Sequence, residues 1–142
     1  MPSNLDALER AFERGDAARV SLGNRADMLT EEQIAARLGV SCANIDYQRV
    51  AGQMLAVDLG VEQGFHYPDW QVELISDPAR RVDFEQALLA LGAGDAWSKY
   101  RFFMQPAPAL GGRTPVTALR VGEGADVAGA AGIWVSGEQG GA

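Results

Sequence analysis

Apolar side chains recur at helical spacing near the start of the chain. Residues 3–20 predict a short amphipathic helix, because three apolar side chains fall on one stripe, three or four positions apart. These side chains are Leu5, Leu8 and Phe12. Residues 21–29 contain glycine and asparagine and predict a connector to the next element.

A capping box marks the start of the next helix. Thr30 stands three residues before Gln33, the spacing at which each side chain accepts a hydrogen bond from the other residue's backbone N–H. Gly39 ends this helix, and Ser41 offers the N-cap of a second helix over residues 42–51. Two short helices joined by a glycine-containing turn are typical of a helix-turn-helix. The side chains expected to face the core are Ile34, Ala35, Leu38, Ile45 and Val50.

Two short runs of strand-forming residues follow the second helix. Residues 54–57 and 65–67 flank a loop with glycine at both ends, which predicts a β-hairpin wing. Pro68 closes the second run, because proline cannot donate a hydrogen bond to a strand ladder.

Helical spacing returns in the second half of the chain. Residues 83–91 and 96–104 each predict a helix, and Thr114 before Pro115 predicts the start of a third. Phe102 lies off the apolar stripe of its helix and is therefore expected at the surface. The side chains expected to face inward on the three helices are Phe84, Ala87, Leu88, Leu91, Ala96, Trp97, Tyr100, Phe103, Met104, Val116, Leu119 and Val121.

The pattern predicts a mainly α protein in four parts. Residues 1–29 form the N-terminal helix and connector, and residues 30–71 form the helix-turn-helix with its β-wing. Residues 72–131 form a small helical domain, which can end in a short turn over residues 126–131. The glycine-rich residues 132–142 are expected to fray as a flexible tail, apart from Ile133, Trp134 and Val135.

The distribution of charge argues against a strongly basic nucleic-acid-binding surface. The chain has 142 residues and a net charge of −7, with an isoelectric point near 4.6. Residues 30–72 hold two basic against six acidic side chains, whereas residues 73–122 hold six basic against five acidic ones. DNA affinity comes largely from cations that neutralise phosphates, so the helix-turn-helix is expected to bind DNA weakly as a monomer.

The sequence contains no recognisable set of catalytic or metal-binding residues. Cys42 is the only cysteine and His66 the only histidine, which excludes an internal disulfide, a multi-cysteine metal site and a histidine pair. His66 fits a half-buried strand, and Cys42 fits a small core position better than a reactive helix start. We therefore expect a protein that acts by binding, with no enzymatic activity, cofactor or metal.

The sequence also predicts no association with a membrane. No apolar run approaches the roughly 18 residues that span a bilayer. The first ten residues, MPSNLDALER, lack the basic and apolar regions of a secretory leader, so a cytoplasmic location is expected.

One run in the second half carries a family resemblance. The sequence PALGGRTP at residues 108–115, followed by VTAL at residues 116–119 and preceded by an aromatic helix, resembles the toxin-binding domain of the Xre/MbcA/ParS antitoxin family. TEEQIAARLGVS at residues 30–41 and GFHYPDWQ at residues 64–71 look like the helix-turn-helix half of a subset of that family. The resemblance covers about residues 28–131. It implies a small, helical and often dimeric antitoxin that neutralises a RES-domain toxin, an enzyme that consumes NAD, and that commonly binds operator DNA.

Two sets of binding residues follow. The DNA-binding set comes from the polar side chains of the predicted second helix of the helix-turn-helix. The toxin-binding set combines residues 110–115, which match the family's signature loop, with Arg101 and Phe102 on the surface of the aromatic helix. Trp97, Phe103 and Met104 match the family's packed helix. The expected DNA-binding residues are Ser41, Asn44, Gln48 and Arg49. The expected toxin-binding residues are Arg101, Phe102, Leu110, Gly111, Gly112, Arg113, Thr114 and Pro115.

Physical chemistry leaves alternatives open for several of these residues. Residues 110–115 fit a partner-binding loop and equally a tight turn, in which glycines adopt positive φ and Thr114 caps a helix. Arg113 can pair with an acidic helix end or face a partner. Asp46 beside Arg49 repels phosphate, although two half-sites of a homodimer would combine their affinities. The alternative function is a DNA-binding regulator, or a dimerisation module without a toxin.

Overall fold

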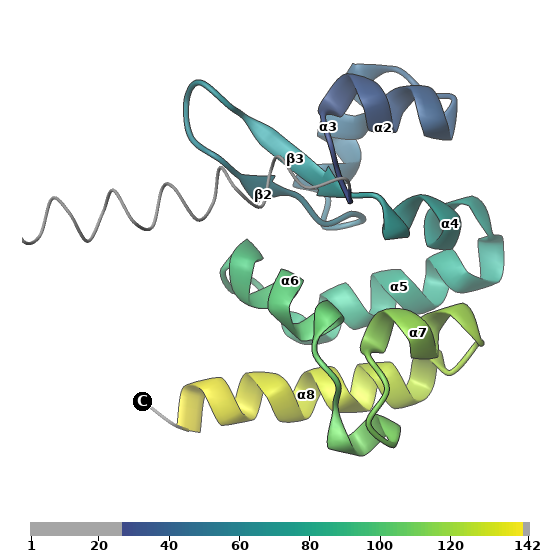
Figure 1. Cartoon of the computed structure of the whole chain (residues 1–142), viewed down its shortest axis with the longest axis vertical. Coiled ribbons are helices and arrows are strands. Elements are labelled where there is room, and N and C mark those ends of the chain that lie inside the picture. Colours follow the sequence, from purple (N-terminus) through teal and green to yellow (C-terminus); the bar gives the residue numbers. More distant parts are fainter. Residues whose placement is uncertain (1–26, 141–142) are drawn as a thin grey trace, which may run out of the picture.

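The computed structural model describes residues 27–140, and their side chains as far as residue 137. The helix expected at residues 3–20 and most of its connector lie outside the described residues. The fold is mainly helical with a small antiparallel sheet, as the sequence predicts. In Figure 1, α2, α3 and the sheet occupy one end of the long axis, and α7 and α8 occupy the other.

The predicted helix-turn-helix is present. Helix α2 (Glu31–Leu38) begins at the capping box of Thr30 with Gln33, and it ends at Gly39, whose φ is 69°. Helix α3 (Cys42–Val50) begins at Ser41, whose hydroxyl accepts a hydrogen bond from the Asn44 backbone. Only glycine adopts the conformation of Gly39 without strain, so this residue fixes the turn between the two helices.

The predicted hairpin gains a third strand. Strands β2 (Val57–Asp58) and β3 (Phe65–Pro68) form the wing, and β1 (Met28–Leu29) pairs with the other edge of β3. The sheet order is β1-β3-β2, all antiparallel. Strand β1 was not predicted, because two apolar residues inside a connector carry no periodic signal.

Two helices connect the wing to the second half of the chain. Helix α4 (Trp70–Ser76) was not predicted, since its 7 residues follow β3 almost directly and are too few for a clear periodic pattern. Its N-cap residue, Asp69, makes no side-chain cap hydrogen bond. Helix α5 (Pro78–Leu91) begins five residues before the predicted start. Asp77 caps it by accepting hydrogen bonds from the Ala79 and Arg80 backbones. Asp77 followed by Pro78 is a recognisable start of a helix, but the apolar spacing used for the prediction begins only at residue 83.

The last helices correct the prediction for the C-terminus. Helix α6 (Ala96–Met104) and helix α7 (Pro115–Arg120) lie close to their predicted positions. The loop between them contains a 3-10 turn, η1 (Pro108–Leu110), which was not predicted. Helix α8 (Gly124–Gly140) is continuous, although a short turn and then a fraying tail from residue 132 were expected. Its alanines and apolar side chains pack across α5, and tertiary packing outweighs the low helix propensity of its glycines.

The buried residues form one cluster that includes side chains from both halves of the chain. Trp70 of α4, Phe84 of α5 and Phe103 of α6 meet at its centre, with ring centroids 5.2–5.8 Å apart. Gln71 is fully buried, and its amide donates to and accepts from the Leu55 backbone at 2.7 and 2.9 Å. Helix α4 therefore joins the helix-turn-helix to the helices that follow it.

Three apolar side chains expected in the core are instead exposed. Val50 is 78% exposed and Val121 58%, because each lies at the end of its helix, beyond the last turn that packs. Met104 is 36% exposed at the end of α6. Tyr100 and Phe103 are buried as predicted, and Trp97 is partly buried against the same core.

Candidate functional site

The polar residues of α3 are largely engaged within the helix. Ser41 caps the helix by accepting from the Asn44 backbone at 3.1 Å. The Asn44 side-chain oxygen accepts from the Gln48 amide at 2.5 Å. Gln48 is only 6% exposed, because its side chain turns back along the helix, so it offers little surface to a base edge.

Arg49 is held against the wing. Its guanidinium donates to the Asp46 carboxylate at 3.0 Å and lies 4.0 Å from the centroid of the Phe65 ring. The ion pair and the cation–π contact together fix a side chain that the sequence assigned to DNA. The exposed face of α3 instead presents Tyr47, which is 67% exposed, and Val50.

An acidic pair lies beside Arg49. A hydrogen bond to Asp46, together with burial, raises the pKa of Glu31 to about 6. The same hydrogen bond and the Arg49 guanidinium lower the pKa of Asp46. Burial raises the pKa of the Tyr67 phenol, and the neighbouring Arg49 partly opposes this shift. This end of the helix-turn-helix therefore carries negative charge close to the surface expected to meet DNA.

The second predicted site is a closed turn. Gly111 and Gly112 have φ of 66° and 84°, the left-handed region that favours glycine. The Ala107 backbone exchanges hydrogen bonds with both sides of the loop: its N–H donates to Arg113 O and its carbonyl accepts from Gly112 N, each at 3.0 Å. Leu110 is buried beneath the turn. The tight-turn interpretation of the sequence therefore describes the geometry of this loop.

Of the two alternatives for Arg113, an internal ion pair or contact with a partner protein, the structure contains the internal ion pair. Both terminal nitrogens donate to the Glu123 carboxylate, one of them at 2.9 Å, and Nε donates to Leu110 O at 3.1 Å. The hydrogen bonds from Arg113 lower the pKa of Glu123. Thr114 caps α7, and Pro115 is buried as the first residue of that helix. Arg113 thus ties the loop to the segment that leads into α8.

The surface position predicted for Phe102 is wrong. Phe102 is 3% exposed, and its ring lies 5.2 Å from that of Phe103 and 5.8 Å from that of Trp134. The prediction rested on the position of Phe102 off the apolar stripe of its helix. It failed because α8 continues past residue 131 and covers this face of α6. Arg101 beside it is exposed on α6.

An apolar groove lies where α6, the loop after it and α8 meet. It encloses about 420 Å³. Phe102 forms part of its wall and Ile133, which is 65% exposed, lies at its edge. The remaining lining residues are Gln105, Pro106, Ala107, Pro108, Ala109, Ala130 and Trp134. The sequence signal that could have found this groove is the apolar run of residues 133–135, which was assigned to the tail.

Comparisons with known proteins leave the family open. No protein-family model, curated protein or solved structure matches the chain. Among the described residues, no helix has the length and apolar character needed to cross a membrane. The described side chains also bring no three histidine, cysteine or acidic groups together as a metal site.

Proposed function

We propose that this chain is an antitoxin-like protein that binds and neutralises a RES-type, NAD-consuming toxin. One observation supports the proposal above the others. Residues 106–109, which lead into and begin the run that resembles the Xre/MbcA/ParS family, form one wall of the apolar groove, and α8 forms the other. An exposed apolar groove with aromatic walls is a common site for a partner's anchoring side chain.

The groove also suggests how the partner would bind. Phe102 and Trp134 provide a packed aromatic base, and Ile133 stands exposed beside them. An apolar side chain of the toxin would displace water from this surface at little conformational cost, because the walls are held by α6 and α8. Leu110 and Arg113 would act indirectly, by fixing the loop that shapes the groove.

Co-expression tests the proposal. The chain should form a complex with a RES-domain protein encoded beside its gene and should restore growth and cellular NAD. Ile133→Asp should abolish both effects, because it places a charge in the groove. Val61→Asp, at a fully exposed wing position, is the matched control and should behave as wild type. The proposal fails if no such neighbour exists, if no complex forms, or if Ile133→Asp neutralises the toxin normally.

A second candidate function is repression of the chain's own promoter, and the helix-turn-helix with its hairpin wing favours it. A homodimer would place two copies of α3 on successive half-sites. A mobility-shift assay against the upstream DNA at two salt concentrations provides the test, since phosphate contacts make affinity fall with salt. An absence of any shift at low salt would favour a module that binds protein alone.

A further inference from the structure

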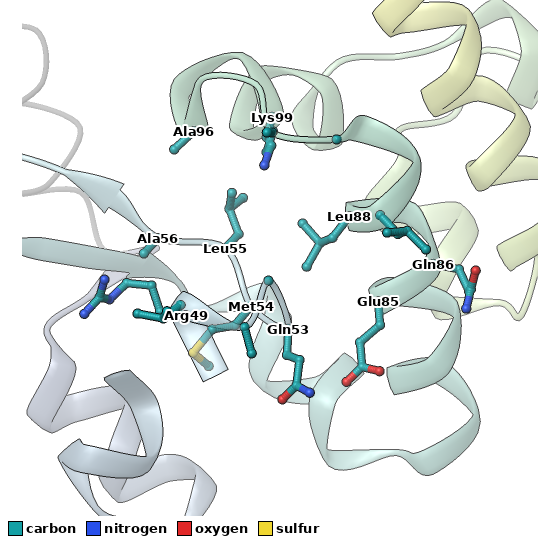
Figure 2. Close-up of a pocket in the computed structure, with 16 residues that line it drawn as sticks. Arg49, Gln53, Met54, Leu55, Ala56, Glu85, Gln86, Leu88, Ala96 and Lys99 are labelled. Atoms are coloured by element: carbon teal, nitrogen blue, oxygen red, sulfur yellow. The ribbon is translucent and has the colours of Figure 1, made fainter. Parts of the chain in front are cut away.

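A second hollow lies at the junction of the two halves of the molecule. It encloses about 760 Å³, where the segment between α3 and β2 meets α5 and α6. Figure 2 shows its lining: Met54 and Leu55 come from the connecting segment, Leu88 from α5 and Lys99 from α6. Of the residues assigned above to DNA or toxin binding, only Arg49 lines this pocket.

Lys99 is distinctive in both sequence and position. It is the only lysine in the chain, beside eleven arginines. Its side chain reaches from α6 toward Leu55 and Leu88 (Figure 2). Burial lowers the pKa of its ammonium group, and the Asp95 carboxylate partly opposes this shift. A half-buried ammonium group beside apolar side chains has lost part of its hydration shell. An anion that pairs with it compensates for this loss.

The other charged groups of the pocket already have partners. Arg49 pairs with Asp46 at 3.0 Å, and Glu85 pairs with Arg81 at 3.1 Å. In Figure 2, Glu85 lies on the side of the pocket away from Lys99. Among the side chains that the structure describes, no carboxylate lies within ion-pair distance of Lys99. Lys99 therefore supplies the charge that a ligand of this pocket would meet.

We propose that the pocket binds a small amphipathic carboxylate. The carboxylate pairs with the ammonium group of Lys99, and a short hydrocarbon chain lies against Met54, Leu55 and Leu88. Lys99 is the cation of the lining that is not paired with a described carboxylate, and it lies beside the apolar side chains of Leu55 and Leu88. This arrangement matches a single negative charge on an apolar body, and it matches a polyphosphate poorly. This inference is independent of the proposed toxin and operator.

The position of the pocket gives such a ligand a structural consequence. It would contact the segment that leaves the helix-turn-helix and also the two helices that follow α4. A ligand that binds only the folded chain raises its stability, by an amount that grows with ligand concentration relative to Kd. Carboxylate binding should therefore raise the melting temperature of the protein.

Calorimetric titration of the full chain with octanoate tests the proposal, with octanamide as the uncharged analogue of the same length. Octanoate should bind saturably, and octanamide at least about tenfold more weakly, because it lacks the charge that pairs with Lys99. Lys99→Met should weaken octanoate by a similar factor, whereas Lys99→Arg should retain most of the affinity. Arg37→Met, which removes a cation from the exposed face of α2, is the control and should change nothing.

Several outcomes would overturn the proposal. They are the absence of saturable binding of octanoate, equal affinities for octanoate and octanamide, and an unchanged affinity in Lys99→Met. The comparison of the two ligands uses wild-type protein alone, so it decides the question even if the variant does not fold.

Discussion

Gly124 begins α8 at a point where a larger residue does not fit. A Cβ atom at position 124 would overlap the Cβ and Cγ atoms of Asp83, which lies in α5. Gly129 lies in the same helix, and a Cβ there would meet no atom within 4 Å. The two glycines therefore separate the effect of close packing from the effect of helix propensity.

Substitution of each glycine by alanine should have opposite effects. Gly124→Ala should lower the free energy of unfolding by about 1–3 kcal/mol, because Asp83 or the helix must move. Gly129→Ala should raise it by roughly 0.5–1 kcal/mol, since alanine is the better helix former. Urea denaturation of the two variants and wild type measures both values. A Gly124→Ala variant as stable as wild type would contradict the close approach of α5 and α8.

Glu31 predicts a pH dependence of stability. A carboxyl whose pKa is raised to about 6 by folding stabilises the protein while it is protonated. That contribution is complete below the ordinary value of 4.5 and is lost as the pH rises through about 6. The pKa of Asp46 is shifted the other way, downward. The charges of Arg49 and Glu32 have smaller effects on the pKa of Glu31.

The Glu31→Gln variant isolates this effect, because glutamine carries no titrating proton. As the pH falls from 7.5 to 5, the melting temperature of wild type should rise relative to that of Glu31→Gln. In the Asp46→Asn background an amide replaces the carboxylate, and this amide can donate to the ionised form of Glu31. The cause of the raised pKa of Glu31 is then gone, so the pH-dependent difference between chains with and without the Glu31→Gln substitution should largely vanish. A difference that persists in this background would show that Asp46 is not the cause.

Phe102 provides the corresponding prediction for the packing of α6 against α8. Phe102→Ala should lower the free energy of unfolding by roughly 3–5 kcal/mol, because it leaves a cavity between Phe103 and Trp134. Met104→Ala in the same helix should cost less than about 1 kcal/mol, since that side chain is partly exposed. Thermal or urea unfolding measures the loss of stability in each of the two variants. A small loss in Phe102→Ala would restore the surface position that the sequence predicts.

The elements that sequence predicts best are those with a local physical signal. The capping box of Thr30, the glycine turn at Gly39 and the Thr114–Pro115 start act within four residues, and each is present. The hairpin was predicted for the same reason, although its first strand covers Val57–Asp58 and not the predicted residues 54–57. The mainly α fold with its small wing thus follows from short-range patterns.

The elements that sequence missed depend on distant contacts. Strand β1 exists because β3 lies beside it, and α8 extends because α5 and α6 offer an apolar surface. The short prediction for α8 also affected the site. Phe102 was placed at the surface because it lies off the apolar stripe of its own helix, and the helix that covers this face was not expected to extend so far. Gln48 and Arg49 were likewise assigned outward by helix position, although contacts with Asn44 and the wing turn them inward.

The whole molecule separates its two proposed binding surfaces. In Figure 1, α3 and the wing lie at one end of the long axis, whereas α8 and the loop after α6 lie at the other. A toxin side chain bound in the groove would therefore not contact α3. Both surfaces belong to a chain with a net charge of −7, so DNA binding depends on how charge is arranged locally at α3.

Asp46 controls that local arrangement. It repels phosphate and also holds the Arg49 guanidinium in an ion pair. If α3 enters the major groove, Asp46→Asn should tighten binding to the upstream DNA by about threefold to tenfold at low salt, because one repulsion is lost and Arg49 is released. Asp126→Asn removes the same charge from α8, at the other end of the molecule, and should have a much smaller effect. Mobility shifts of both variants at two salt concentrations make the comparison. Equal effects would mean that only net charge matters and that α3 does not contact the DNA, whereas a larger effect of Asp46→Asn would place α3 at the interface.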